Sequence, residues 1–309
     1  MDGILNINKA VGVTSHDVVA KIRHMLKQRR VGHTGTLDPL ASGVLPICIG
    51  QGTRVAEYLS ESGKAYQAEI TFGVVTDTYD TEGEIIRQGD TSGLTLARIQ
   101  EALLHFQGEL QQMPPRYSAI KVQGQPAYKL ARAGVEVTLE TRNVTIHALD
   151  IRGWSLPRLT LAVSCSKGTY IRSLAYDLGE YLGCGAHMSG LVRTRSGPFL
   201  LEDSLTLEQL ALAIEEGQEA VERHLFPADY ALQNYPALNL SVEQTERVLH
   251  GNPFRIESDA AKEEASTTGS IETDETPTLG RVYAADGRFL AIATWNAAIQ
   301  QWQPKKVLN

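Results

Sequence analysis

Cysteine is scarce in this chain of 309 residues. Its three cysteines, Cys48, Cys165 and Cys184, are an odd number and include no Cys-x-x-Cys pair. This pattern argues against a disulfide framework and against a structural zinc site. The sequence also has no stretch of 18 consecutive apolar residues, and no basic segment followed by an apolar one opens it. We therefore expect a soluble, cytoplasmic protein with no membrane association.

Motifs that hold common cofactors are missing as well. The sequence contains no P-loop, no His-Glu-x-x-His motif, no EF-hand loop and no Gly-x-Gly-x-x-Gly fingerprint. None of the histidines, including His16 and His187, has the spacing of metal ligands. We predict that the protein uses no metal and no cofactor.

Negative charge predominates, with a formal net charge of −7, but it is unevenly distributed. Residues 1–54 carry seven Lys and Arg against three Asp and Glu, and residues 111–199 carry eleven against five. Acidic residues are in excess in 61–110, 200–229 and 256–280. Phosphate binding requires a local positive field rather than a positive total. The sequence therefore predicts a polarised surface that offers one basic face to a nucleic acid.

The most distinctive stretch is the signature segment, residues 32–46, which reads GHTGTLDPLASGVLP. Asp38 is its only carboxylate and stands among glycines, small hydroxyls and prolines. Proline fixes φ and glycine admits backbone angles that other residues avoid, so we expect this segment to have one unusual shape. Fixed loops beside strands often carry catalytic groups. Asp38 could equally be a simple turn residue, because Asp before Pro is common in turns.

Hydrophobic periodicity predicts a mixture of helices and strands. Alternation over residues 66–74 predicts a strand. Apolar spacing predicts helices over 95–107, 170–182 and 206–216, and another that starts with Ser15 as its N-cap. Because no regular βαβ repeat is present, we expect an α+β fold with a mixed, largely antiparallel sheet.

The signature segment and the upstream KAVGVTS at residues 9–15 closely resemble the bacterial tRNA pseudouridine-55 synthases, the TruB family. Further matches follow in order: Lys64-Ala65-Tyr66, PPRYSAIK at 114–121, CSKGTYIR at 165–172 and LVRTRSGPF at 191–199. The blocks span roughly residues 3–200. Several ordered blocks at family-like spacing are far more specific than any one of them.

The resemblance implies the pseudouridine synthase fold, a bent sheet with a central cleft, over residues 1–232. Residues 114–145 would then be the insertion that grips the RNA loop. Residues 235–309 resemble, more loosely, a small PUA-like β-barrel that binds RNA, with a helix over 241–251 and two strands around an Asp286-Gly287 turn. A plain β-rich stabilising domain is the alternative. Residues 257–277, rich in Glu, Asp, Ser and Thr, are predicted to be an acidic linker.

The isomerisation of uridine breaks the glycosidic C–N bond, turns the base and rejoins it through carbon, so no atom is gained or lost. It requires a carboxylate near the sugar, either as a nucleophile or to stabilise charge and remove a proton. The resemblance places this catalytic carboxylate at Asp38. It also implies substrate-binding roles for the ion-pair partner Arg172, the base-stacking Tyr66, the second tyrosine Tyr170 and the apolar wall Leu191. Taken alone, Arg172 would be a surface helix residue and Tyr66 a core tyrosine.

Two further residues come from the resemblance. His33 matches the residue that fills the space left by flipped nucleotides, although a loop histidine bonded to backbone is a serious alternative. Lys9 is retained from the first family motif. Ala10 replaces the proline that usually follows it, which removes a φ restraint at that turn.

The implied function is that of a tRNA pseudouridine-55 synthase, which isomerises a T-loop uridine by base flipping. It would bind the T-arm and acceptor end of tRNA as a monomer and without guide RNA. Two alternatives are a tRNA-folding chaperone that uses the same cleft without chemistry and a guide-RNA-dependent subunit. Asp38, Arg172 and Tyr66 favour an enzyme, and the basic 114–145 insertion argues against the guide-dependent subunit.

Overall fold

A ten-stranded sheet runs through the computed structural model, which describes residues 1–118, 120–122, 124–135, 138–256 and 279–308. Its order is β14-β1-β3-β12-β4-β11-β10-β7, with β2 paired to β3 and β13 to β12. The bounds are β1 Gly3–Lys9, β2 Val31–His33, β3 Ala41–Ile49, β4 Lys64–Phe72, β7 Gly108–Gln112, β10 Arg142–Ser155, β11 Arg158–Cys165, β12 Ala186–Ser196, β13 Phe199–Leu200 and β14 Leu225–Phe226. Only β3 with β12 is parallel among these pairs. The predicted α+β fold with a mixed, largely antiparallel sheet is confirmed.

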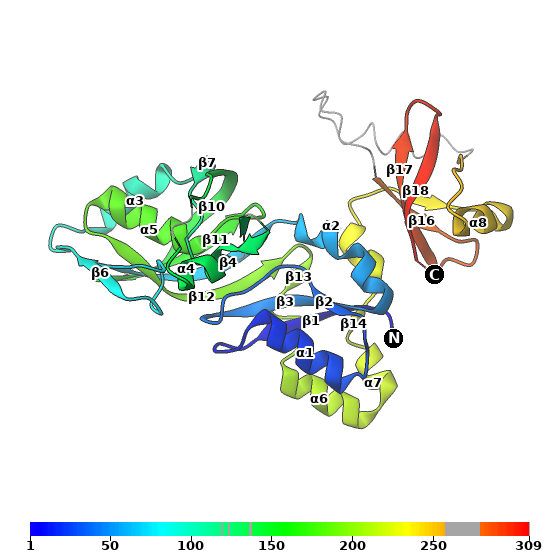
Figure 1. Ribbon diagram of the computed structural model, residues 1–309, viewed down its shortest axis with the longest axis horizontal. Coiled ribbons are helices and arrows are strands. Elements are labelled where there is room, and N and C mark those ends of the chain that lie inside the picture. Colours follow the sequence, from blue (N-terminus) through cyan, green and yellow to red (C-terminus); the bar gives the residue numbers. More distant parts are fainter. Residues whose placement is uncertain (119, 123, 136–137, 257–278, 309) are drawn as a thin grey trace.

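The parallel pairing of β3 with β12 joins the two halves of the sheet (Figure 1). Gly43 lies opposite Arg193 at this junction. Its φ is 102°, and a Cβ at this position would lie 2.3 Å from the Arg193 carbonyl oxygen, so the close approach requires glycine. Arg193 also pairs with Tyr66 of the antiparallel neighbour β4. The turn that leads into β3 and carries Asp38 is therefore brought close to Tyr66.

Helices cover both halves of the sheet (Figure 1). α6 (Leu207–Glu216) packs on β1 and on α1 (Ser15–Met25), and α5 (Ile171–Leu182) packs on β12, β4 and α3 (Leu96–Leu104). The remaining elements here are η1 Gly50–Val55, α2 Ala56–Ser60, β5 Val74–Thr76, β6 Ile85–Gln88, α7 Gln218–Glu222 and η2 Ala228–Leu232. The predicted helices over 95–107, 170–182 and 206–216 are confirmed.

The start of α1 differs from the prediction, because Thr14 and not Ser15 caps the helix. Thr14 Oγ1 accepts a hydrogen bond from the Asp17 backbone at 3.1 Å, and the Asp17 carboxylate accepts one from the Thr14 backbone at 2.9 Å. Ser15 is buried, and its Oγ accepts from Leu37 N at 2.8 Å and donates to Leu37 O at 3.1 Å. Ser15 thus fixes the residue before Asp38.

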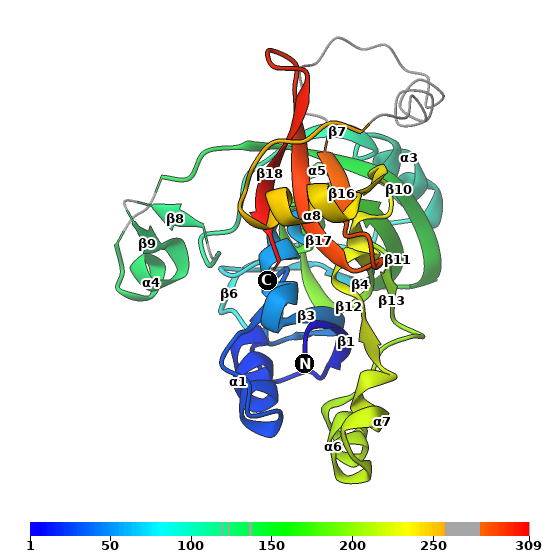
Figure 2. The same ribbon diagram turned by 90° about the vertical axis from the view of Figure 1, so that its right-hand side faces the viewer.

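The insertion 114–145 follows β7 and extends away from the sheet (Figure 2). It contains β8 (Lys121–Val122), β9 (Gln125–Pro126) and α4 (Ala127–Arg132). The chain rejoins the sheet at β10. Its role in gripping RNA stays a prediction.

The C-terminal unit contains a four-stranded sheet and one helix among the described residues. The strands are β15 Ala237–Asn239, β16 Leu279–Tyr283, β17 Phe289–Asn296 and β18 Gln301–Val307, in that order across the sheet, and the helix is α8 Val242–Leu249. The predicted helix and the strand pair around Asp286-Gly287 are confirmed. The described part of this sheet is open, so the predicted PUA-like barrel is not confirmed. The predicted acidic linker 257–277 lies outside the described residues, and the domain boundaries stay predictions.

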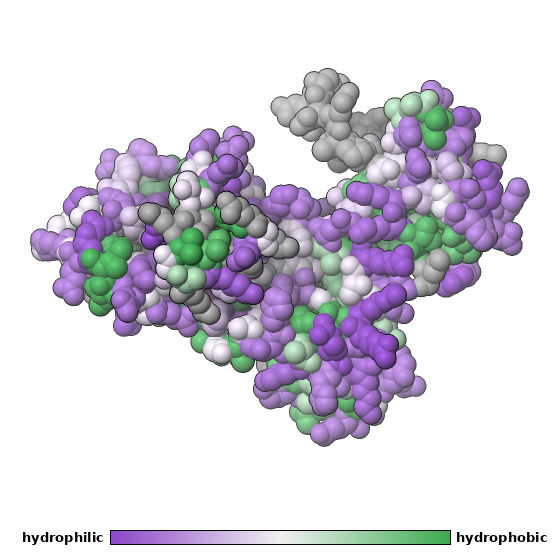
Figure 3. Space-filling model, viewed as in Figure 1, coloured by the Kyte–Doolittle hydropathy of each residue, from purple (hydrophilic) through white to green (hydrophobic). Residues whose placement is uncertain are grey.

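The surface in the orientation of Figure 1 is mostly hydrophilic (Figure 3). Apolar residues gather in small groups, such as the one over β6, where Ile85 and Ile86 are 60 % and 62 % exposed. None of the described helices is long and apolar enough to span a bilayer.

Candidate active site

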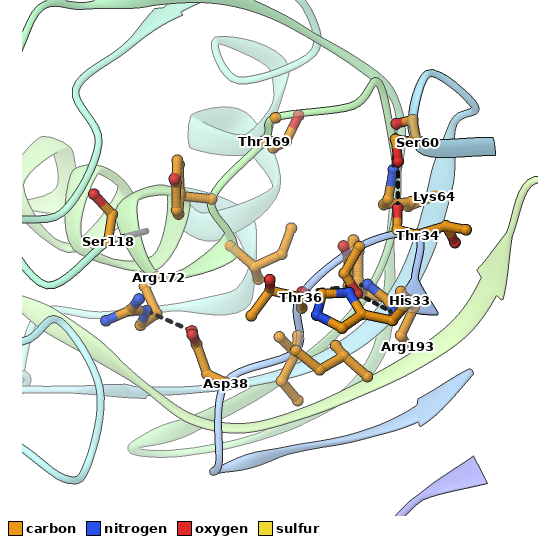
Figure 4. A pocket seen from close by; sticks show the side chains of 17 residues that line it. His33, Thr34, Thr36, Asp38, Ser60, Lys64, Ser118, Thr169, Arg172 and Arg193 are labelled. Carbon is orange, nitrogen blue, oxygen red and sulfur yellow. Dashed lines mark hydrogen bonds and ion pairs between the residues drawn. The ribbon is translucent and has the colours of Figure 1, made fainter. Parts of the chain in front are cut away.

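A cavity of about 440 Å³ lies between the signature segment, β4, β12 and the start of α5 (Figure 4). Six of the seven predicted site residues line it: His33, Asp38, Tyr66, Tyr170, Arg172 and Leu191. They come from distant parts of the sequence and meet because β12 joins β3 to β4. Lys9 is not among the residues that line the cavity.

Asp38 lies at the edge of this cavity with a side chain that is 38 % exposed. Its Oδ2 is 3.0 Å from Nε of Arg172, and Figure 4 shows the two groups pointing toward each other. The backbone carbonyl of Asp38 accepts a hydrogen bond from the Ala41 N–H at 3.0 Å, which closes a turn. Asp38 is therefore a turn residue through its backbone, while its carboxylate remains available for chemistry on the cavity side.

Arg172 lies in the first turn of α5, and its side chain is only 6 % exposed. Besides Asp38 it pairs with Asp80, whose Oδ2 is 3.3 Å from Nη1, and it donates to the Tyr117 carbonyl at 2.9 Å. Asp80 is itself held by the Thr78 hydroxyl at 2.6 Å. A guanidinium with this many fixed acceptors has one orientation. Sequence reasoning missed Asp80, for which the only signal was an acidic turn after residue 76.

Tyr66 and Tyr170 supply aromatic surface to the cavity. Tyr66 is 8 % exposed, and burial raises the pKa of its hydroxyl, so the phenol stays neutral. Tyr170 is fixed through its backbone, because its N–H donates to Gln112 Oε1 at 2.8 Å and its carbonyl accepts from Gln112 Nε2 at 3.0 Å. The Arg142 guanidinium lies over the Tyr170 ring, 5.6 Å from its centre.

Two buried cations, Arg193 and Lys64, lie on the side of the cavity away from Arg172 (Figure 4). Arg193 is 1 % exposed and donates to the carbonyls of Val44 at 2.6 Å and Gly35 at 3.0 Å, so it ties the signature segment to β12. Lys64 donates to the carbonyl of Ser62 at 3.0 Å. Burial, assisted by the charge of Arg193, lowers the pKa of Lys64 to about 8. Sequence reasoning placed both cations in matched blocks but gave neither of them a role in the site.

Lys9 is fully buried behind the signature segment. Its ammonium donates to the carbonyls of Ala10 at 2.9 Å and Val13 at 2.8 Å, and burial lowers its pKa to about 8. The position of Lys9 fits a structural support better than the predicted contact with substrate. It holds the turn at Ala10, where the resemblance led us to expect proline.

His33 lies at the cavity, and its ring meets that of His16 edge-on with 5.5 Å between centroids. Its Nδ1 is buried and has no hydrogen-bond partner within the described part of the chain. Burial, with a smaller contribution from His16, lowers the pKa of His33, so its imidazole is neutral at neutral pH. The alternative of a loop histidine bonded to backbone finds no support at Nδ1 within the described residues.

The site as a whole combines one directed carboxylate, an aromatic floor and surrounding positive charge. In the ranges that the structure describes, no three His, Cys, Asp or Glu side chains cluster as metal ligands. The arrangement suits a reaction in which a carboxylate acts on an anionic substrate that carries a flat ring.

The fold is that of a pseudouridine synthase. The fold matches the crystal structure of a Cbf5-Nop10-Gar1 complex with a TM-score of 0.74 and 25 % identity, over 99 % of this chain and 85 % of the matched chain. A structure titled as an H/ACA RNP bound to a substrate RNA containing 2′-deoxyuridine matches with a TM-score of 0.73, at the same identity and coverage.

Sequence comparison defines the family more closely. Residues 23–171 match the TruB family pseudouridylate synthase N-terminal domain, and residues 172–233 match the tRNA pseudouridylate synthase B C-terminal domain. The proteins named tRNA pseudouridine synthase B from Clostridium kluyveri and Pseudomonas aeruginosa are 47 % and 43 % identical, each over 94 % of this chain and over 95 % and 91 % of their own lengths. The chain belongs to the TruB family of pseudouridine synthases.

Proposed function

We propose that this chain converts the uridine at position 55, in the T-loop of tRNA, to pseudouridine. The observation that carries the proposal is the Asp38 carboxylate, held 3.0 Å from Arg172 beside a cavity with aromatic walls. The names of the relatives, tRNA pseudouridine synthase B, support tRNA as the substrate. The basic excess in residues 1–54 and 111–199 supports binding of a polyanion.

In the proposed reaction the C1′–N1 bond of uridine breaks and a C1′–C5 bond forms. C5 gives up a proton and N1 gains one, so the atoms balance. Asp38 is the catalytic carboxylate that acts at the sugar, and Arg172, 3.0 Å away, orients it. Tyr66 stacks on the detached uracil. A flat ring face tolerates rotation of the base, whereas fixed hydrogen bonds would oppose it.

The target uridine must leave its stack to enter a cavity of this kind. We propose that the flipped base enters between Tyr66 and Leu191, and that Tyr170 contacts it from the side of α5. His33 then occupies the space that the base leaves in the RNA loop. A neutral, half-buried imidazole is suited to this role, because it can stack without placing a charge between bases.

We further propose that the protein acts as a monomer in the cytoplasm and without guide RNA. The insertion 114–145 would hold the T-arm, and residues 235–309 would contact the acceptor end. The near end-to-end match with the relatives named tRNA pseudouridine synthase B supports a tRNA enzyme of this kind.

The test is to map isomerised uridines by mass spectrometry. An unmodified tRNA transcript is incubated with the purified protein, and pseudouridine is labelled chemically because its mass equals that of uridine. We expect complete conversion at position 55 and none elsewhere. A transcript with cytidine at that position is the control and should remain unlabelled. Pseudouridine at another position, or none, would overturn the proposal, and faster tRNA refolding without any pseudouridine would favour the chaperone alternative.

A further inference from the structure

A second cavity, of about 810 Å³, adjoins the active-site cavity. Its walls come from the end of the insertion, the start of β10 and the turn at residues 167–168. The two cavities share Ser60 and Gly168 in their linings, so they lie side by side. A strand of RNA whose base occupies the first cavity therefore has an adjoining space for its backbone.

Arg142, the first residue of β10, lines this second cavity. Its Nε is buried and lacks a hydrogen-bond partner among the described residues, and within the same residues its guanidinium forms no ion pair. An unpaired buried donor is costly unless a ligand supplies the acceptor. The Tyr170 ring beneath the guanidinium holds it at the boundary between the two cavities.

The turn at Gly168 lies beside the Arg142 guanidinium and lines both cavities. Gly168 has a φ of 77°, and a Cβ there would come within 3.6 Å of Arg142 Nη1. The neighbouring Lys167 also lines the second cavity, and its ammonium pairs with Glu61. Both partners of this pair are more than half exposed. Exposed pairs contribute little stability, so a phosphate can replace Glu61 at small cost.

We propose that Arg142 and Lys167 bind a backbone phosphate of the substrate RNA next to the flipped nucleotide. This inference rests on the proposed function, because it takes the RNA strand to run from the first cavity into the second. The planar fork of an arginine matches two phosphate oxygens, and an adjacent ammonium adds a second positive charge. Glu140 also lines the cavity and is exposed. Its negative charge disfavours the binding of free anions, whereas an RNA phosphate is also held by the base bound in the active-site cavity.

The test combines protein and RNA changes. The affinity of wild-type protein and Arg142→Gln is measured for a T-arm stem-loop and for versions with a neutral methylphosphonate at each phosphate flanking the target. In wild type, one neutral linkage should weaken binding about tenfold, the scale of a hydrogen bond between charged groups. In Arg142→Gln the same linkage should have a clearly smaller effect, because only the Lys167 contact remains to be lost. Arg142→Lys should recover part of the affinity.

Arg152→Gln is the matched control, since Arg152 lies on the same strand but is exposed and pairs with Asp150 at 3.7 Å. It should keep the full response to the neutral linkage. The slope of log Kd against log salt should fall by about 0.7 for Arg142→Gln, as for one single-strand phosphate contact, and by less for the control. Additive effects of the Arg142 change and every neutral linkage would overturn the inference. Wild-type conversion of the same stem-loop is assayed in parallel, so failure of the proposed function would be seen separately.

Discussion

The two sides of the active-site cavity hold their charges in different ways. On the α5 side, Arg172 lies between two carboxylates, Asp38 and Asp80, at 3.0 and 3.3 Å. On the opposite side, Arg193 and Lys64 are buried and donate to backbone carbonyls, and neither forms an ion pair with a described carboxylate.

This difference separates two tasks. Paired charges fix geometry, because each partner removes orientations from the other, and here they give the Asp38 carboxylate one direction. Cations held by neutral groups remain largely uncompensated, and they contribute a positive field in a region of low dielectric. Burying them costs free energy of folding. An anionic substrate would recover part of that cost, which links the stability of this side to RNA binding.

The largest effect should come from Asp38→Asn, which removes the reacting charge and preserves the shape. Pseudouridine formation should fall by about 10⁴-fold, the order seen when a single catalytic side chain is removed. Affinity for tRNA should change little, since the lost carboxylate contributes no attraction to phosphate. Single-turnover conversion and filter binding on the same preparation measure the two quantities. Conversion within tenfold of wild type would disprove the catalytic assignment.

Arg172→Ala should be the next largest change, because it affects both carboxylates. Activity should fall by about 100-fold or more as Asp38 loses its orienting partner, and the free energy of unfolding should fall by about 3 kcal/mol, since Asp80 is left buried and unpaired. Denaturant melts and single-turnover rates measure the two effects. Arg172→Lys keeps the charge without the planar fork and should give an intermediate rate.

The double variant Arg172→Ala/Asp80→Asn separates those two effects. Replacing the buried charge by a neutral amide should restore most of the lost stability, while activity stays low because Asp38 still lacks its partner. If the amide restored activity together with stability, Arg172 would serve the fold rather than the positioning of Asp38.

A smaller effect is expected on the side of the cavity that holds Arg193 and Lys64. There the pH dependence of the free energy of unfolding reports the protonation of Lys64. Its pKa is about 8 in the folded protein, against 10.5 for an unperturbed lysine, so the unfolded chain binds more protons between these values. The free energy of unfolding should therefore rise from pH 8 to 10.5, by about 1–3 kcal/mol from this residue. Subtracting the profile of Lys64→Met removes the contributions of other titrating groups. Parallel profiles for the two proteins would contradict the assignment.

The smallest effect should come from residues 257–277, whose composition offers little apolar surface to bury. Replacing them by a short Gly/Ser linker should change the melting temperature by no more than a few degrees and the conversion rate by less than about twofold. Thermal melts and multiple-turnover assays give both values. A large loss of either would show that this segment packs on the protein or contacts RNA, and would remove the contrast with the active-site region.

Some of the site could be predicted because its signals are local. Glycine and proline around Asp38 favour a sharp turn wherever the segment lies, and helical spacing after residue 170 places Arg172 in the first turn of a helix. The α+β class followed from periodicity in the same way. The resemblance to the TruB family then indicated which of these residues belong to one site, and the cavity contains six of the seven. The prediction that Ser15 caps the first helix was wrong, because Thr14 forms the capping box and Ser15 binds Leu37, a residue from outside the helix.

The sequence by itself determined the segment that carries Asp38, the helices and strands around it and the uneven charge. The tertiary structure alone decided that Asp80 holds Arg172, that Arg193 supports the signature segment, and that Lys9 lies behind the cavity. It also decided that Arg142 lies at the boundary of two cavities. Each of these roles depends on a partner brought near by the β3–β12–β4 pairing or by the packing of α5. A local pattern contains no information about such partners, because burial and ion pairing are set by groups that are distant in the chain.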